Sequence, residues 1–270
     1  MIIGGRKFNT TKYTYVMGIL NVTPDSFSDG GRWKDKGEAL RHVEEMIAGG
    51  MDILDIGGES TRPGYTQISD DEEIARVVPI IEAVKANFNI PISLDTYKSA
   101  VAAAGIAAGA DLINDIWGLK YDDRMAGIIA ESKVACCLMH NREKAGYQDL
   151  RRDMAEDLQE TIRLAREARI DNEKIILDPG IGFAKSHEDN LMAMRHLEDL
   201  NMLGYPILLG ASRKSMIGLS LGFESGKRLE GTLVTTVFAV IKGCSFVRVH
   251  DVKENAMVIR MAQDILYGIR

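Results

Sequence analysis

Short apolar runs alternate with longer amphipathic segments along the whole chain. The short runs are too brief for helices and are apolar at successive positions, which is typical of strands buried on both faces of a parallel sheet. This pattern predicts strands at residues 16–20, 53–56, 92–94, 112–113, 134–139, 175–177, 207–209 and 246–249.

The amphipathic segments between these strands are predicted to be helices. The clearest helix begins after Ser69, which has the spacing of a capping box with Glu72. Apolar side chains follow at helical spacing, at Ile74, Val77, Val78, Ile81 and Val84. Further helices are expected at residues 38–48, 99–108, 149–168, 191–197, 231–241 and 254–266, with a short one at 125–131.

This alternation predicts an α/β fold of about eight βα units, the number that closes a parallel barrel. We therefore expect a single (β/α)₈ TIM barrel domain over residues 1–270, with no break in composition between its units. An open, doubly wound sheet is the alternative, because it contains the same alternation of elements.

The composition and net charge argue against some classes of binding partner. Of the 270 residues, 46% are hydrophobic and 27% charged, as in ordinary globular proteins. The net charge of -6 has the wrong sign for a phosphate backbone or an anionic membrane surface, so neither nucleic acid nor membrane is expected as a partner. The three cysteines are too few for a disulfide framework, and no signal or membrane-spanning segment is evident. We therefore expect a cytoplasmic protein.

Polar side chains recur just after the predicted strands, where parallel α/β folds build their ligand sites. In chain order they are Asn21, then Glu59 with Thr61 and Arg62, Asp95, Asn114, His140, Asp178, Ser212 with Arg213 and Lys214, and Arg248 with His250. Any one of them is explained as a helix cap or a loop contact. The complete set at one end of successive units indicates a binding site.

These side chains have the chemistry for a ligand with two unlike ends. Asp95, Asn114 and Asp178 offer acceptors to a flat heterocycle that carries ring N–H and amine donors. A hydrolase with paired carboxylates is the competing interpretation. Lys214 and Arg248 supply positive charge for an anion, and His250 lies on the same strand face as Arg248.

Two glycine-rich segments follow the first two strands. The first, residues 21–31, begins with Asn21, whose side-chain carbonyl could be a ligand of Mg²⁺ or whose amide could donate to a phosphate. The second, residues 57–64, combines glycine N–H groups with a hydroxyl and the guanidinium of Arg62, which suits an anion. No Walker A motif, dinucleotide fingerprint or zinc spacing is present in the sequence.

Seven segments, in this order, resemble the dihydropteroate synthases, which make folate precursors and are the target of sulfonamides. They are residues 18–30 (GILNVTPDSFSDG), 55–64 (DIGGESTRPG), 93–96 (SLDT), 113–115 (IND), 177–183 (LDPGIGF), 210–215 (GASRKS) and 248–252 (RVHDV). The first two are highly specific, whereas a short pair such as Asn-Asp is weak. Ala184 and Ser186 depart from the family, whose members often carry Gly and Thr there.

The resemblance implies a dimeric (β/α)₈ barrel that joins p-aminobenzoate to 6-hydroxymethyl-7,8-dihydropterin diphosphate with loss of pyrophosphate, assisted by Mg²⁺. It further implies a role for each matching residue. The pterin ring would be held by Asp95, Asn114, Asp178 and Lys214 and lined by Met139 and Phe183. Mg²⁺ and pyrophosphate would be approached by Asn21, and phosphate oxygens would be bound by Arg62, Arg248 and His250. The p-aminobenzoate pocket would be formed by Thr61, Arg62, Pro63, Phe183 and Ser212, and a loop that orders over the site would contain Asp25, Ser26 and Phe27.

Two other functions are compatible with a pterin-binding barrel. A methyltransferase that moves a methyl group from methyltetrahydrofolate to a corrinoid protein would share the barrel and the acids, but is not expected to carry both the Asn21 loop and the Thr61-Arg62-Pro63 loop. A paralogue that binds pterin without turnover is the third possibility, and the complete acidic and basic sets argue against it.

Overall fold

Eight parallel strands form the centre of the molecule. The structure is a computed structural model that describes residues 1–22, 32–60 and 66–269. Its large sheet has the strand order β8-β7-β6-β5-β4-β3-β10-β9. The strands are β3 (Tyr15–Asn21), β4 (Ile53–Gly57), β5 (Ile92–Asp95), β6 (Leu112–Asp115), β7 (Ala135–Met139), β8 (Ile175–Asp178), β9 (Leu208–Leu209) and β10 (Phe246–Val249). Every strand expected from the sequence is confirmed.

The sheet closes on itself between β8 and β9. Leu177 and Ile207 form a parallel bridge, and the backbone N–H of Leu177 donates to the carbonyl of Pro206 at 2.9 Å. A closed sheet of eight parallel strands is a TIM barrel, so the open doubly wound sheet is excluded.

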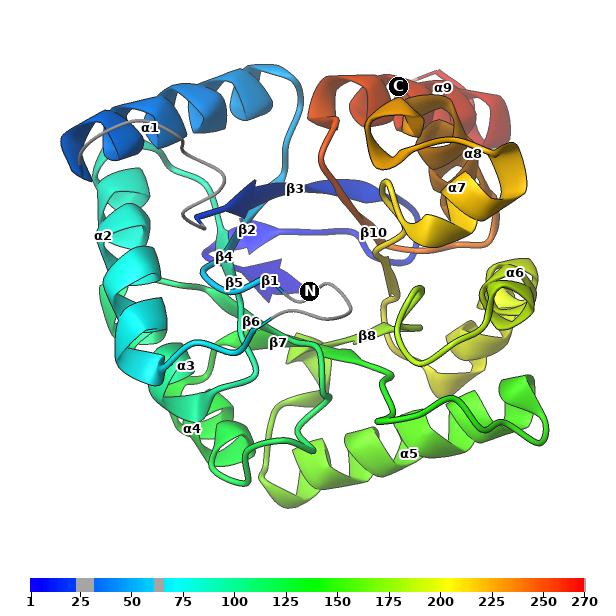
Figure 1. Cartoon of the computed structure of the whole chain (residues 1–270), viewed down its shortest axis with the longest axis horizontal. Helices are drawn as coiled ribbons and strands as arrows, with labels where there is room; N and C mark the ends of the chain where they lie inside the picture. Colours follow the sequence, from blue (N-terminus) through cyan, green and yellow to red (C-terminus); the bar gives the residue numbers. More distant parts are fainter. Residues whose placement is uncertain (23–31, 61–65, 270) are drawn as a thin grey trace.

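Helices surround the strands on the outside (Figure 1). They are α1 (Arg32–Ala48), α2 (Asp70–Asn87), α3 (Ser99–Ala108), α4 (Met125–Ser132), α5 (Leu150–Glu167), α6 (His187–Arg195), α7 (Ser215–Leu221), α8 (Leu229–Ile241) and α9 (Val252–Tyr267), with 3₁₀ turns at Asn172–Lys174, Leu197–Leu203 and Ser225–Lys227. Ser69 caps α2 as expected, accepting from the N–H of Glu72 at 3.2 Å.

Helix starts are where the expectations were least accurate. The helix expected at 191–197 begins at His187, because Ser186 and Asp189 form a reciprocal capping box one turn earlier. The short helix α7 was not expected from its sequence, and neither was an N-terminal hairpin of β1 (Ile2–Ile3) and β2 (Arg6–Lys7).

The hairpin closes the N-terminal end of the barrel. Ile3 and Phe8 are each 1% exposed and pack among inward-facing side chains of the barrel strands. This apolar layer contains Met17, Ile53, Leu112, Ala135, Cys137, Ile176, Leu208 and Phe246. Apolar side chains thus fill the N-terminal end of the barrel. Inward-facing polar side chains lie in the middle and at the C-terminal end, where the strands end.

Candidate active site

Three polar side chains expected at the site come from three strands of the barrel, β5, β6 and β8. Asp95 and Asn114 are paired in register on β5 and β6, and Asp178 ends β8. Their exposed fractions are 7%, 4% and 5%, so all three are buried. The Oδ1 atom of Asp95 is buried and accepts no hydrogen bond from the part of the chain that the structure describes. A buried carboxylate oxygen without a partner is costly, which indicates a donor supplied by a ligand.

Arg248 is the counter-charge at the centre of the mouth. Its Nη2 donates to Oδ2 of Asp95 at 2.5 Å, and its Nε donates to Oδ2 of Asp55 at 2.6 Å. Oδ1 of Asp55 accepts from the hydroxyl of Ser93 at 2.5 Å. Burial opposes the charge of Arg248, but the carboxylates of Asp55 and Asp95 hold the pKa of its guanidinium above the usual range. The guanidinium therefore stays charged.

Burial also changes the pKa of Asp95. It raises the pKa of the Asp95 carboxyl, and the nearby charge of Asp55 adds to the rise, while Arg248 works against it. The carboxyl is thereby held close to the point where it can change its protonation state, which is common in functional sites.

Lys214 and Asp178 lie near one another beside Gly210. A Cβ placed on Gly210 would lie 3.5 Å from Oδ2 of Asp178 and 4.0 Å from Nζ of Lys214. Burial lowers the pKa of Lys214 to about 8, although the carboxylate of Asp178 favours the charged amine. Burial likewise raises the pKa of Asp178, and the charge of Lys214 and the N–H of Gly180 limit the rise.

An apolar wall adjoins these charges. Met139 packs in a small cluster with Tyr97 and Ile116, and Phe183 lies against it. Nζ of Lys214 is 4.6 Å from the centre of the Phe183 ring, within the range of a cation–π contact. Carboxylates and an amide beside aromatic and thioether side chains make a slot suited to a flat polar ring.

Asn21 borders the same space. A Cβ placed on Gly57 would be 3.6 Å from Oδ1 of Asn21 and 3.8 Å from Oδ2 of Asp95. Within the described ranges 1–22, 32–60 and 66–269, no three His, Cys, Asp or Glu side chains are grouped to hold a metal ion. The carbonyl of Asn21 is nevertheless the kind of oxygen that Mg²⁺ takes when most of its other ligands are water and substrate phosphates, so the residues present fit that ion.

Ser212 and His250 are in direct contact. The hydroxyl of Ser212 lies 3.0 Å from Nδ1 of His250 and accepts from the backbone N–H of His250 at 3.2 Å. These residues were expected to serve different substrates, p-aminobenzoate and pyrophosphate. The two residues on which these separate expectations rest are therefore adjacent.

Six residues expected at the site lie outside the described residues, so the structure does not test them. They are Asp25, Ser26 and Phe27 in the first loop and Thr61, Arg62 and Pro63 in the second.

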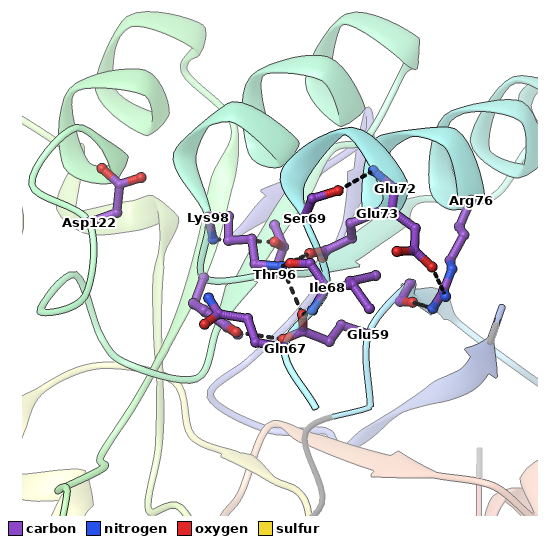
Figure 2. A network of polar contacts seen from close by, with 12 residues as sticks. Glu59, Gln67, Ile68, Ser69, Glu72, Glu73, Arg76, Thr96, Lys98 and Asp122 are labelled. Atoms are coloured by element: carbon purple, nitrogen blue, oxygen red, sulfur yellow. Dashed lines mark hydrogen bonds and ion pairs between the residues drawn. The ribbon is translucent and has the colours of Figure 1, made fainter. Parts of the chain in front are cut away.

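A buried ionic network joins the two described flanks of the second loop (Figure 2). Nζ of Lys98 donates at 2.8 Å to Glu59, to Glu73 and to the carbonyl of Ile68. Glu59 also accepts from the N–H of Ile68 at 2.8 Å and from the hydroxyl of Tyr97 at 2.5 Å. Because the side chains of Lys98, Glu59 and Glu73 are at most 4% exposed, this network is a fixed frame beside the mouth.

Sequence reasoning named Glu59 as a candidate site residue but assigned no role to Asp55, Lys98 or Glu73. Asp55 could have been found, because it is two residues after Ile53 on an otherwise apolar strand, so both side chains point to the inside of the barrel. A carboxylate in that position needs a buried partner. Lys98 and Glu73 gave no such signal, since both stand in segments that also read as solvent-exposed loop and helix.

Comparisons with known proteins agree with this geometry. The family model of pterin binding enzymes matches residues 17–250. The dihydropteroate synthase of Clostridium beijerinckii is 57% identical, and the alignment covers 98% of this chain and 99% of that protein. The crystal structure of dihydropteroate synthase from Clostridium difficile in the presence of pteroic acid has a TM-score of 0.94 and 47% identity, covering 97% of this chain and all of that one.

A second solved structure contains one of the two substrates of the expected reaction. It is the dihydropteroate synthase of Xanthomonas albilineans with 4-aminobenzoic acid, which has a TM-score of 0.93 and 39% identity and covers 98% of this chain and 97% of that one. Among the described residues, none of the helices has the length and apolar character needed to cross a membrane.

Proposed function

This chain belongs to the dihydropteroate synthases of the pterin binding enzyme family, and we propose that the side chains at its barrel mouth divide the reaction among them. The reaction is the condensation of p-aminobenzoate with 6-hydroxymethyl-7,8-dihydropterin diphosphate, which releases pyrophosphate in folate biosynthesis. The enzyme is thus a transferase of an alkyl group other than methyl.

The observation that carries the assignment of the pterin site is the unpartnered Oδ1 of Asp95 beside Asn114 and Asp178. The pterin ring has a guanidine-like edge of ring N–H and exocyclic amine, which needs acceptors in its plane. Asp95, Asn114 and Asp178 supply them, and Met139 and Phe183 line the slot on the apolar faces of the ring. Lys214 binds the polar ring from the Phe183 side.

The pyrophosphate is assigned to the basic side chains of the mouth. Arg248 and His250, with Arg62, bind its phosphate oxygens, and Asn21 lies at the same opening. Asn21 would hold Mg²⁺ together with the diphosphate, and that ion would supply positive charge that polarises the leaving group.

The chemical step needs no protein nucleophile. The bond between the pterin methylene carbon and the diphosphate oxygen breaks first, and its electron pair leaves with pyrophosphate, next to Arg248 and His250. The positive charge left on the methylene spreads into the pterin ring, where Asp95 and Asp178 stabilise it. The amine of p-aminobenzoate then forms the new C–N bond and loses a proton.

The p-aminobenzoate pocket is assigned to Thr61, Arg62, Pro63, Phe183 and Ser212. Of these, Ser212 and Phe183 are described, and each borders a different wall: Ser212 contacts His250, and Phe183 faces Lys214. The amine would thus approach between the pyrophosphate side and the pterin side. Asp25, Ser26 and Phe27 would cover the site and exclude water from the cation.

We further propose a homodimer that works in the cytoplasm. Large apolar side chains are exposed on two neighbouring helices, among them Val234 on α8 at 65% and Ile265 on α9 at 71%. Surface of this kind is a common sign of a protein interface. Cys136, Cys137 and Cys244 are free and buried, which suits a reducing compartment.

The direct test is turnover by the purified protein. Given both substrates and Mg²⁺, it should release pyrophosphate and form dihydropteroate, and a sulfonamide should compete with p-aminobenzoate. The Asp178→Asn variant serves as the matched control and should be nearly inactive. Absence of pyrophosphate release from wild-type protein with a cooperative unfolding transition would refute the function.

A further inference from the structure

Lys185 is a half-buried lysine that the reaction as described does not use. Its Nζ lies 2.8 Å from Nδ1 of His140 and donates to the carbonyls of Gly180 at 3.0 Å and Phe183 at 3.3 Å. An ammonium group has three N–H donors, and here each of them has an acceptor. Lys185 therefore joins the loop after β8 to the end of β7.

His140 is itself held from the other side. Its Nε2 lies 2.9 Å from Oδ2 of Asp157 on α5, and the same oxygen accepts from Nε of Arg142 at 2.6 Å. Burial and the nearby charge of Lys185 lower the pKa of His140 to about 3, so the ring is neutral. The carboxylate of Asp157 can only accept, so the ring proton is on Nε2, and Nδ1 accepts from Lys185. The His140 side chain is 0% exposed. Lys185 is thus attached to a rigid part of the barrel.

The loop that Lys185 binds has an irregular backbone conformation. Gly180, Gly182 and Ala184 have φ values of 68°, 85° and 43°, all in the left-handed region. The backbone also passes very close to β7, since a Cβ on Gly180 would come within 1.9 Å of the carbonyl oxygen of His140. Lys214 binds the carbonyl of Ile181 in the same loop. Three of the loop's carbonyls are thus bound by two lysines.

We propose that Lys185 is a positioning residue for the pterin slot: it ties the loop of residues 180–183 to His140 and so places the Phe183 ring. This inference rests on the proposed function of the slot. Lys185 binds the backbone of Phe183, whereas Lys214 lies 4.6 Å from the ring of Phe183 and contacts the loop from the site itself. Lys185 acts on the ligand through Phe183, and Lys214 acts directly.

The Lys185→Met variant tests the proposal, because methionine keeps an unbranched chain and removes the three donors. The dissociation constant for 6-hydroxymethylpterin, and KM for the dihydropterin diphosphate, should rise about tenfold, with kcat changed by less than about threefold. Lys144→Met, at an exposed lysine of the preceding β7–α5 connection, is the matched control and should bind pterin like wild type.

A second variant restores the missing group. Lys185→Cys, alkylated with 2-bromoethylamine, carries an ammonium at nearly the original reach, and the native cysteines are at most 2% exposed and so protected while the protein is folded. Modification, verified by mass, should recover the pterin affinity that the unmodified variant lacks. Wild-type pterin affinity in Lys185→Met, a loss of kcat without a loss of affinity, or failure of the modified cysteine to restore binding would overturn the proposal. Failure of wild type itself to bind pterin would instead count against the proposed function.

Discussion

Arg248 and Asp95 are paired inside the barrel mouth, Nη2 of Arg248 donating to Oδ2 of Asp95 at 2.5 Å, although they are 153 positions apart in the sequence. The same guanidinium binds Asp55 at 2.6 Å, deeper in the barrel. Arg248 therefore has two tasks, because it compensates two buried carboxylates and stands beside the proposed pyrophosphate site. One side chain links the acidic half of the site to its basic half.

Replacement of Arg248 should cost stability as well as activity. In Arg248→Met, the 0%-exposed carboxylate of Asp55 loses its counter-charge, and breaking such a buried pair typically costs about 3–5 kcal/mol. Urea unfolding should show this loss, and addition of Asp55→Asn to the variant should recover part of it. A variant as stable as wild type would contradict the role of Arg248 as structural counter-charge.

Asp178 should matter for the pterin ring itself, independently of the diphosphate. Asp178→Asn replaces an acceptor-only oxygen by an amide donor, so binding of 6-hydroxymethylpterin should weaken by about 10- to 100-fold. Fluorescence titration of the pterin measures this. Asp123→Asn, at an exposed aspartate in the loop after β6, is the control. Equal affinity in wild type and Asp178→Asn would remove Asp178 from the pterin site.

The clustering of polar side chains at the site was predictable from the geometry of parallel β-strands. Asp95 and Asp178 end two buried strands and Asn114 is the last residue but one of a third, and parallel strands bring their carboxyl ends to one edge. The alternation of apolar strands and helices likewise predicted the barrel. Roles for single residues came from the resemblance to a family, not from spacing.

Contacts across the barrel were not predictable in the same way. Nothing in the sequence near Lys185 indicates that His140 accepts from it, since that contact depends on how two loops pack after the barrel closes. The hairpin at residues 2–7 was missed for a related reason. Its strands have two residues each, too few to show a period, and burial of Ile3 depends on the barrel beneath it.

Lys214 should set an alkaline limb in the pH dependence of the reaction. Burial lowers its pKa to about 8, so the amine loses its charge on passing from pH 7 to pH 9, whereas an exposed lysine would stay charged. The value of kcat/KM for the dihydropterin diphosphate should fall over that range. Lys214→Arg, which stays charged, should lack this limb even if its activity is lower. Identical alkaline limbs in both proteins would exclude Lys214 as their origin.

At acid pH, protonation of Asp95 and Asp178 should weaken the binding of pterin. The pKa values of Asp95 and Asp178 are both raised by burial, so each gains its proton at a higher pH than an exposed aspartate does. Protonation removes an acceptor from the pterin edge, so pterin affinity should fall on acidification, starting above the usual range for aspartate near 3.8. Isothermal titration of pterin across this range, with Asp178→Asn as reference, measures the effect. A flat profile in wild type would contradict it.

Lys98 should be required for the frame around Glu59. In Lys98→Met, two carboxylates that are at most 3% exposed share a buried site without their ammonium, so stability should fall by about 3–5 kcal/mol. Chemical denaturation measures the loss. Addition of Glu73→Gln removes one of the two charges and should recover part of the stability. If the double variant is no more stable than Lys98→Met, charge compensation is not the task of Lys98.

Asn21 should affect the metal requirement of the reaction and leave recognition of the ring intact. Its Oδ1 borders the space over Gly57 next to Asp95, and Asn21→Leu keeps the volume while removing this oxygen. If Asn21 holds Mg²⁺ with the diphosphate, the Mg²⁺ concentration for half-maximal turnover should rise about tenfold. Binding of 6-hydroxymethylpterin should not change, because that ligand has no diphosphate.

Asn87→Leu, at the exposed end of α2, is the control and should need as much Mg²⁺ as wild type. An unchanged Mg²⁺ requirement in Asn21→Leu would remove Asn21 from the metal site, whereas weaker pterin binding would place its amide on the ring instead.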